Sequence, residues 1–277
     1  MTVTSYEGGN AVIYDIIIAK MQSINDIASR GALMHTVEIK SFVEYISYLE
    51  QYYNRNYIFR GIHNLNHRLI PKIGRVPYIQ QCNGEGSFLL DELQDIESKA
   101  VDEFVKKAIP HVNLREASSW DQWTIAQHHG LPTRLLDWTE NPMIAAYFAT
   151  ENANGDVAVY VTNREQFNIV TRTTDDTDRD VLSFADEDEV VLFTPDYIHP
   201  RISAQKGLFT VHKNPTVPLD ETMINGETCQ VDQLIIKAEN IGEFVKDLDW
   251  CGINRSFIYP GLDGLAYYID LKSKGVL

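Results

Sequence analysis

Apolar positions along the chain follow two spacings, one typical of helices and one typical of short strands. Helical spacing predicts helices over about residues 41–53, 86–108, 120–129, 142–150, 241–248 and 263–271. Short β-branched and aromatic runs predict strands over about residues 57–59, 156–161, 208–212 and 234–238. Strands and helices are interspersed without regular βαβ spacing or a Gly-rich nucleotide fingerprint. The pattern therefore favours an α+β fold, with a mixed or antiparallel central sheet and helices packed around it.

Polar residues at the helix ends sharpen some of these boundaries. Thr36 and Ser41 are both candidate caps for the first of these helices, and Glu44 would complete a capping box with Ser41. The spacing therefore favours the later start. Pro142 suits the first turn of a helix that Asn141 or Thr139 would cap.

The chain shows no internal repeat, so we expect one domain over residues 38–277 and an N-terminal extension over residues 1–37. The apolar stretch Ala11–Ala19 is short, lacks a preceding basic segment and is interrupted by Asp15. It reads better as a first helix or strand that packs on the core than as a signal peptide. No apolar run is long enough to cross a bilayer, so no membrane partner is expected.

Cysteine and histidine usage favours a cytoplasmic protein without a metal. The three cysteines are widely spaced and odd in number, which argues against a disulfide framework and favours a reducing compartment. None of the eight histidines has a recognised metal-ligand spacing.

The net charge of −15 disfavours general nucleic-acid binding through phosphates, but the charge is distributed unevenly. Residues 55–75 contain five basic residues and two histidines with no Asp or Glu, whereas residues 175–189 are strongly acidic and predict an exposed loop with a short helix. The acid-free segment predicts recognition of an anionic small molecule. Alternatively, these bases pair with acidic loops of the same chain.

The segment from Phe59 to Arg75 begins with an arginine at the end of a predicted strand. The guanidinium of Arg60 is suited to bidentate recognition of a phosphate or a carboxylate, and Gly61 permits close backbone approach. In the alternative interpretation, Arg60 clamps a carboxylate of this chain, such as that of Asp137.

The segment from Gln127 to Pro142 places many kinds of polar group between apolar anchors. It offers an amide, two imidazoles, an arginine, a carboxylate, an indole and two hydroxyls, on Gln127, His128, His129, Arg134, Asp137, Trp138, Thr133 and Thr139. Such variety is typical of a satisfied buried network or of a site. A histidine could act as an acid or base near neutral pH, and Trp138 could stack on a flat ring. Arg134 could instead pair with Asp137.

These two segments resemble the FRG domain, a bacterial and phage-associated family named after the tripeptide that is here Phe59-Arg60-Gly61. The resemblance rests on that tripeptide, on Asn64, Leu69-x-Pro71 and Arg75, and on the run from Ala126 to Pro142. It covers residues 38–160 well and continues more weakly to Leu265. It implies an FRG domain with a C-terminal extension, acting in a bacterial or phage conflict system as a defence or toxin protein, with a protein partner or antitoxin.

The order of the segments is also similar, more distantly, to that of arginine-type ADP-ribosyltransferases. This resemblance implies an ADP-ribosyltransferase-like fold and the use of NAD, with Arg60 holding a phosphate or ribose. Trp138-Thr139, leading into Ala145–Ala149, corresponds to the middle motif. Gln205 occupies the position of the glutamate in the third motif. A glutamine can orient a ribose hydroxyl but lacks the negative charge that stabilises an oxocarbenium-like state.

An acid from elsewhere, such as Glu140 or Glu239, would therefore have to substitute for that glutamate. The resemblances imply the catalytic residues Arg60, His128, Thr139 and Gln205, and the NAD-binding residues Arg60, Gly61, Asn64, Arg75, Arg134, Asp137 and Trp138.

Two other function classes remain open at the level of sequence. The first is a ligand-sensing or protein-interaction module that binds an anion without turnover. The second, which we rank last, is phosphoester chemistry with His128 or His129, because the sequence shows no metal-binding carboxylate cluster and is acidic overall.

Overall fold

A computed structural model describes residues 34–53, 56–112, 114–170, 181–184, 189–196 and 199–277. The predicted element at Ala11–Ala19 and most of the acidic segment 175–189 lie outside these residues.

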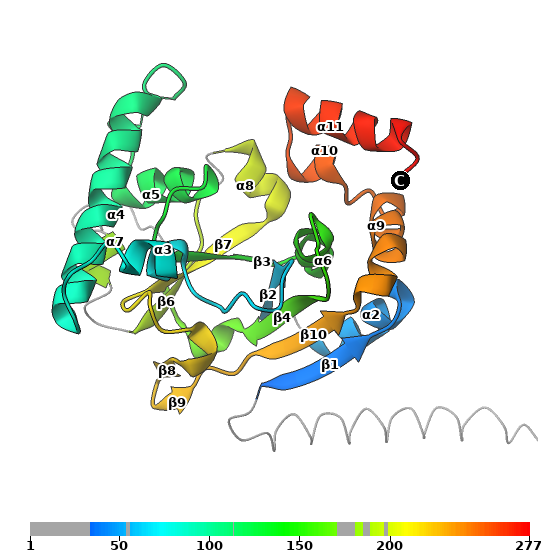
Figure 1. The fold of residues 1–277 in the computed structure, drawn as a ribbon, viewed down its shortest axis with the longest axis horizontal. Coiled ribbons are helices and arrows are strands. Elements are labelled where there is room, and N and C mark those ends of the chain that lie inside the picture. Colours follow the sequence, from blue (N-terminus) through cyan, green and yellow to red (C-terminus); the bar gives the residue numbers. More distant parts are fainter. Residues whose placement is uncertain (1–33, 54–55, 113, 171–180, 185–188, 197–198) are drawn as a thin grey trace, which may run out of the picture. The chain divides into compact units, whose positions relative to one another are not determined.

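A mixed sheet runs through the described residues (Figure 1). Its eight strands, in spatial order, are β1 (His35–Ile39), β10 (Asp232–Ile236), β4 (Val157–Asn163), β2 (Tyr57–Ile62), β3 (Leu135–Thr139), β7 (Gly207–His212), β6 (Val190–Phe193) and β5 (Asn168–Val170). The two outermost pairs are parallel, and the pairs between them are antiparallel. A separate hairpin pairs β8 (Met223–Ile224) with β9 (Glu227–Thr228). The predicted α+β class with a mixed sheet is confirmed.

Helices surround this sheet in the described part of the chain. They are α2 (Phe42–Leu49), α3 (Val76–Ile79), α4 (Ser87–Ala108), α5 (Ser119–His128), α6 (Pro142–Thr150), α7 (Val181–Phe184), α8 (Pro200–Gln205), α9 (Ile241–Trp250), α10 (Arg255–Ile258) and α11 (Leu262–Ser273). Short 3₁₀ turns lie next to helices or between strands, at Glu50–Tyr52, Lys72–Gly74, Arg164–Gln166, Leu219–Glu221 and Ala238–Asn240.

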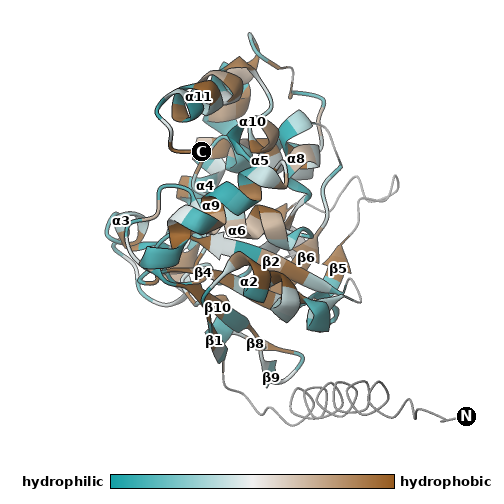
Figure 2. Ribbon diagram, turned by 90° about the vertical axis from the view of Figure 1, so that its right-hand side faces the viewer, coloured by the Kyte–Doolittle hydropathy of each residue, from teal (hydrophilic) through white to brown (hydrophobic). Residues whose placement is uncertain are grey.

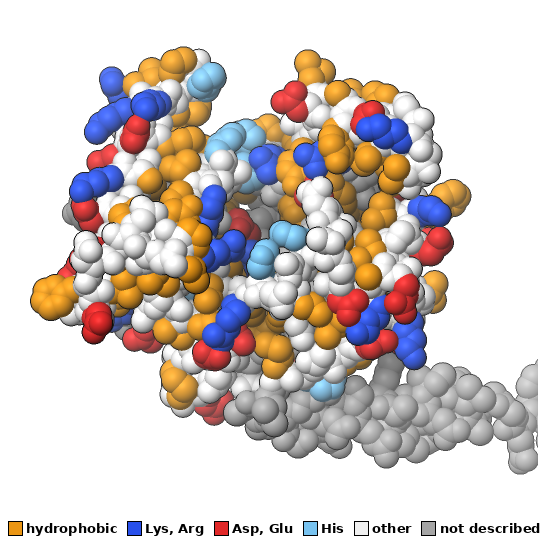
Figure 3. All heavy atoms as spheres, viewed as in Figure 1, with side chains coloured by type: hydrophobic (Ala, Val, Ile, Leu, Met, Phe, Trp, Pro, Cys, Tyr) orange, Lys and Arg blue, Asp and Glu red, His pale blue; other side chains and the backbone are white. Residues whose placement is uncertain are grey.

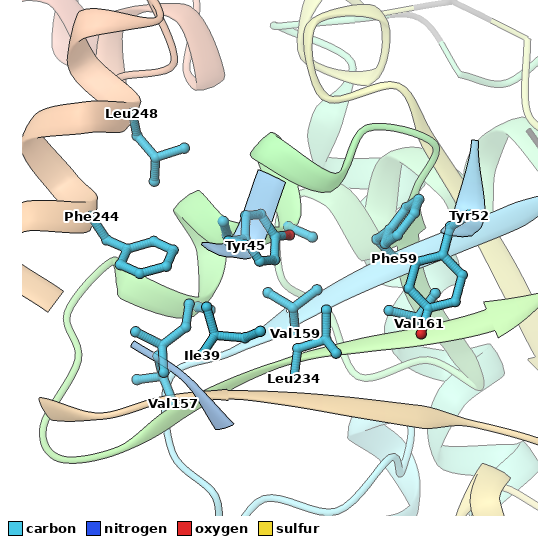
Figure 4. Close-up of a cluster of buried hydrophobic side chains, with 14 residues drawn as sticks. Ile39, Tyr45, Tyr52, Phe59, Val157, Val159, Val161, Leu234, Phe244 and Leu248 are labelled. Atoms are coloured by element: carbon cyan, nitrogen blue, oxygen red, sulfur yellow. The ribbon is translucent and has the colours of Figure 1, made fainter. Parts of the chain in front are cut away.

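One face of the sheet is covered by two groups of helices. Figure 4 shows α2 and α9 contributing Tyr45 and Phe244 to a cluster over the β1–β10–β4–β2 half, which the alanines of α6 complete. Trp120 and Trp123 of α5, with Val101 of α4, form a second cluster over β3, β7 and β6. In Figure 2, the part of the sheet from β2 to β5 is coloured largely brown (hydrophobic), whereas α9 carries teal (hydrophilic) stretches.

The opposite face carries its own core, because side chains alternate along each strand. On β3, Leu135 belongs to the cluster under α4 and α5, whereas Leu136 and Trp138 belong to the cluster on the other face. This cluster on the other face also includes Leu69, from the loop after β2, and Leu219, from a 3₁₀ turn after β7.

Side-chain caps account for several helix starts. Ser41 accepts a hydrogen bond from the Glu44 backbone N–H at 3.1 Å, and the Glu44 carboxylate accepts one from Lys40 N–H at 2.8 Å. The prediction of the later start is confirmed, and the alternative cap Thr36 lies in β1 instead. Asn141 caps α6, with Pro142 in its first turn, as predicted.

In the described ranges, no helix is long and apolar enough to cross a membrane. All three cysteines are free thiols.

Candidate functional site

A cleft opens where β2 and β3 diverge. The two strands share one register pair, Phe59 with Thr139, whereas β2 continues along β4 and β3 continues along β7. Beyond that pair, the backbone groups of β3 that face β2 have no strand partner there. A side chain must then satisfy them, since unpaired buried backbone groups are costly.

The cleft has a volume of about 360 Å³. Its wall comes from β2, β3, β7, α5, α6 and α8, and includes Arg60, Gly61, His63, Gln127, His128, Asp137, Trp138, Thr139, Phe148, Glu151, Arg201, Gln205 and Gly207. In Figure 3, blue basic and pale-blue histidine side chains gather around a hollow on the face shown. Seven of the residues predicted from the two resemblances thus meet in one cavity: Arg60, Gly61, His128, Asp137, Trp138, Thr139 and Gln205.

Arg60 closes the gap between the diverging strands. Its guanidinium Nη1 donates to the backbone carbonyl of Asp137 and lies 3.5 Å from the Asp137 Oδ2 atom. The Arg60 Nε atom is buried without a hydrogen-bond partner among the described residues. Burial, the largest cause, lowers the Arg60 pKa, and Arg75 lowers it further, while Asp137 opposes the change. One donor of a buried cation is thus left over for a ligand.

A relay of hydrogen bonds holds Asp137 in place. The Gln127 side-chain amide donates to Asp137 Oδ2 at 2.9 Å, and its carbonyl accepts from the hydroxyl of the fully buried Thr133 at 2.6 Å. The Thr133 hydroxyl in turn accepts from Leu135 N–H. This relay explains why the predicted segment needs an amide, a hydroxyl and a carboxylate at these spacings.

Asp137 also acts electrostatically on three arginines. It opposes the lowering of the pKa of Arg60, of Arg75 and of Arg201, and burial is the main cause of the lowering in each case. Because about half of the Asp137 side chain is exposed, it neutralises these cations incompletely. The local charge therefore favours an anion.

Arg201 lies on α8, lines the cleft and is held by an aromatic ring. Its guanidinium lies 4.6 Å from the centre of the Tyr259 ring, and Arg255 lies 4.5 Å from the centre of the same ring. The Arg201 Nε atom is buried and, among the described residues, has no hydrogen-bond partner. Arg201 was not predicted from the sequence, although it lies only four residues before Gln205.

Glu151 is the second carboxylate in the cleft wall, and it too was missed. It accepts hydrogen bonds from the hydroxyls of Tyr147 at 3.0 Å and Tyr259 at 2.7 Å, and it pairs with Arg255. These contacts fix α10 to the end of α6. Glu151 follows the predicted helix 142–150 directly, but its partners Arg255 and Tyr259 lie more than 100 residues away and left no local signal.

Three histidines cluster at one end of the cleft. The ring centres of His128, His129 and His199 lie 5.4–5.9 Å apart. Burial, followed by Arg201 and the neighbouring histidines, lowers the His128 pKa to about 3, and the pKa of His129 and of His199 is lowered as well. His128 is therefore neutral at neutral pH, and its buried Nε2 atom has no partner among the described residues. A neutral imidazole can accept one hydrogen bond through one ring nitrogen and donate one through the other.

Two predicted catalytic side chains, those of Thr139 and Gln205, form hydrogen bonds to backbone groups of the protein. The Thr139 hydroxyl donates to the Gln205 carbonyl at 2.7 Å and accepts from Asn141 N–H at 3.1 Å. The Gln205 amide donates to the Ile258 carbonyl at 3.1 Å. Both residues therefore join the cleft wall to neighbouring elements.

Trp138 and Gly61 shape the wall from behind. The Trp138 indole N–H donates to Thr210 at 3.1 Å, and its ring is buried in the core on the opposite face. A Cβ on Gly61 would lie only 2.0 Å from the Ala145 carbonyl oxygen. Gly61 therefore permits close approach of helix α6. Of the aromatic side chains in the wall, Phe148 is only partly buried.

Three predicted NAD-binding residues do not line the cleft. The Asn64 side chain accepts from Asn66 N–H within a turn, and Arg75 Nε donates to the Ile70 carbonyl. Arg134 is buried and pairs with Glu97 at 2.9 Å. The alternative pairing of Arg134 with Asp137 is therefore wrong, because Arg134 and Asp137 have different partners.

Neither alternative acid lines the cleft. Glu140 pairs with Arg164 at 3.1 Å, and Glu239 is exposed in the 3₁₀ turn before α9. Across the described ranges, no group of three or more His, Cys, Asp or Glu is placed to hold a metal ion.

Comparison with known proteins identifies one family segment. No curated protein and no solved structure matches the chain. The model of the FRG domain matches residues 55–157, which run from just before β2 to the first residue of β4. The chain therefore carries a segment that matches the FRG domain, and residues after that segment, from Arg201 to Phe209, complete the cleft.

Proposed function

We propose that the cleft binds an anionic, nucleotide-like small molecule through Arg60, and that NAD belongs to the class of ligands it accepts. The observation that carries this proposal is the buried Arg60 guanidinium, which has a free Nε donor and a half-exposed counter-ion shared with two other arginines. A phosphate oxygen at Nε would satisfy that donor and add negative charge where the protein supplies too little.

The rest of the wall supports a ligand that also carries a ring. The cleft volume of about 360 Å³ falls within the range of small-molecule sites. Phe148 is partly buried and lines the cleft, so it can contact a flat group, while the neutral His128 can form a hydrogen bond with it.

The experiment is a calorimetric titration of the purified chain with NAD, ADP-ribose and adenosine. We expect NAD and ADP-ribose to bind and the uncharged adenosine to bind at least 10-fold more weakly, since a charge-assisted hydrogen bond contributes about 1.5–3 kcal/mol. Arg60→Gln should lose a large part of the difference in affinity between ADP-ribose and adenosine. Arg60→Lys, which keeps the charge but not the planar fork, should recover part of it.

Arg68→Gln is the matched control. Arg68 belongs to the same acid-free basic segment, but it is half exposed and pairs with Glu221 outside the cleft wall. Equal losses in the Arg60 and Arg68 variants, or binding of adenosine as tight as that of ADP-ribose, would contradict the proposal.

A second candidate function is transfer of ADP-ribose from NAD to an acceptor protein or nucleic acid. It is favoured because Arg60, Thr139 and Gln205, taken from three separate segments, reach one cleft. The carboxylates of the cleft wall are Asp137 and Glu151, and both already have partners in the described residues. Bound NAD would supply the glycosidic bond to nicotinamide, which breaks in the transfer. The residues of this cleft would orient the phosphates and the nicotinamide ring.

Release of nicotinamide separates the two candidates. If release occurs and is lost in Arg60→Gln but not in Arg68→Gln, the transferase function is supported. If NAD binds and is recovered intact, the protein is a ligand-sensing module. The role in a bacterial or phage conflict system, with a protein partner or antitoxin, is a proposal that rests on the FRG resemblance.

A further inference from the structure

Arg201 repeats the features of Arg60 in a different wall of the same cleft. Both arginines are partly buried, both line the cavity, and both have a buried Nε atom without a partner in the part of the chain that the structure describes. They come from different elements, β2 and α8, and lie 141 positions apart in the sequence.

The carboxylates near Arg201 are committed elsewhere. Asp137 is hydrogen-bonded to Gln127 and paired with Arg60. Glu151 accepts from Tyr147, Arg255 and Tyr259. No carboxylate of the described residues lies within ion-pair distance of the Arg201 guanidinium, so its charge is balanced only at longer range.

Arg201 is nevertheless held in one place. Tyr259 stacks with it at 4.6 Å, and the Tyr259 hydroxyl is fixed to Glu151 at 2.7 Å. The Gln205 amide also anchors α8 to α10 through the Ile258 carbonyl. A partly buried cation that is positioned in this way, with a buried donor atom and no carboxylate beside it, is expected to have an anionic partner from outside the chain.

We infer that Arg201 is a second anion-binding point and that the ligand of this cleft therefore carries two phosphoryl groups, one for Arg60 and one for Arg201. The inference rests on the proposed function and names the ligand class more narrowly. Tyr259 is then a positioning residue, because it acts on the ligand only through Arg201.

The test compares ADP-ribose, which has two phosphoryl groups, with AMP, which has one, at a single ionic strength in calorimetry. Wild-type protein should bind ADP-ribose at least 10-fold more tightly than AMP. Arg201→Gln should weaken ADP-ribose by about 10-fold or more and AMP much less, because AMP can still use Arg60. The preference for ADP-ribose should then largely disappear.

Two variants of Tyr259 separate positioning from folding. Tyr259→Phe keeps the ring under Arg201 and should retain the preference for ADP-ribose. Tyr259→Leu removes the ring and should reduce the preference several-fold, while thermal unfolding shows whether both variants remain folded.

The outcomes distinguish the two proposals. If ADP-ribose binds and Arg60→Gln weakens it but Arg201→Gln does not, the second point is refuted and the proposed function stands. If Arg201→Gln weakens ADP-ribose and AMP by the same factor, both arginines serve one phosphate and the two-phosphate class is refuted. If the wild-type protein binds neither ligand, the proposed function fails and the inference falls with it.

Discussion

Single side chains show how differently two arginines of the FRG-like motifs are used. Arg60 lines the cleft and keeps a free donor, whereas Arg134 is buried outside it and pairs with Glu97, which is fully buried. Both were expected to bind NAD, because sequence alone shows the residue type and not its partner. Glu97 lies on α4, 37 positions before Arg134. It falls at helical spacing between the buried Leu93 and Val101, but this spacing does not show which cation it pairs with.

Replacement of Glu97 by alanine should therefore affect stability strongly. It leaves Arg134 as a buried charge without this carboxylate, which typically costs about 3–5 kcal/mol. We expect that loss in the free energy of unfolding, measured with urea. Glu103→Ala on the same helix is the control, since Glu103 is exposed and pairs only with Lys107, and it should cost less than about 1 kcal/mol. Similar losses in the two variants would refute the structural role of the buried pair.

His212 gives the fold a pH dependence. It is the last residue of β7 and is fully buried, and burial, followed by Arg60 and Arg134, lowers its pKa to about 3 from the ordinary value near 6.5. Between these values the unfolded chain takes up a proton that the folded chain does not. Stability from this group is therefore complete above about pH 6.5 and falls as the pH drops toward 3.

The slope from His212 should reach about 1.4 kcal/mol per pH unit. Urea unfolding at pH 7, 6 and 5 measures it, and His212→Gln should show a shallower decline than the wild type over this range. Because both proteins share all carboxylates, the difference in slope reports His212. Parallel curves would contradict burial of a neutral imidazole here.

At the scale of elements, sequence patterns predicted the long and strongly periodic pieces well. α4, α6 and β4 lie within a few residues of their predicted bounds. The predictions missed β6, whose four residues are all buried and show no alternation, and α8, which has six residues and begins with proline. Since α8 carries Arg201, the sequence predictions contained only one of the two arginines that we propose as anion-binding points, Arg60.

The contact between β2 and α6 rests on a glycine. A Cβ at Gly61 would overlap the backbone of Ala145 and Ala149, so Gly61→Ala must push the helix off the strand. We expect a loss of about 3 kcal/mol or a failure to fold, measured by thermal unfolding. Gly207→Ala is the matched control on the far side of the cleft, because a Cβ there meets open space and should change stability little. A tolerated Gly61→Ala would contradict the close packing.

The link from α6 to α10 depends on one carboxylate. Glu151→Ala removes the acceptor of Tyr147, Tyr259 and Arg255 together. Amide hydrogen exchange in residues 255–273 should become at least several-fold faster, because α10 loses its attachment at this end of the cleft. Glu140→Ala, which removes an exposed pair with Arg164, should leave exchange in that segment unchanged. If exchange in residues 255–273 is unchanged in Glu151→Ala as well, Glu151 does not hold α10 to α6.

The whole molecule is acidic, with a net charge of −15, yet one cleft contains two arginines that are only partly neutralised. The acid-free run of residues 55–75 pointed to this region from the sequence. It did not show that Arg68 pairs with Glu221 on the surface while Arg60 faces the cavity. Convergence of β2, β3 and α8 depends on strand order, which local patterns do not encode.

The most direct test of the central claim is a crystal structure of the protein with ADP-ribose. We expect a phosphoryl oxygen within hydrogen-bond distance of the Arg60 guanidinium, in the cleft between β2 and β3. A ligand bound elsewhere, or one in the cleft with Arg60 still bonded only to Asp137, would contradict it.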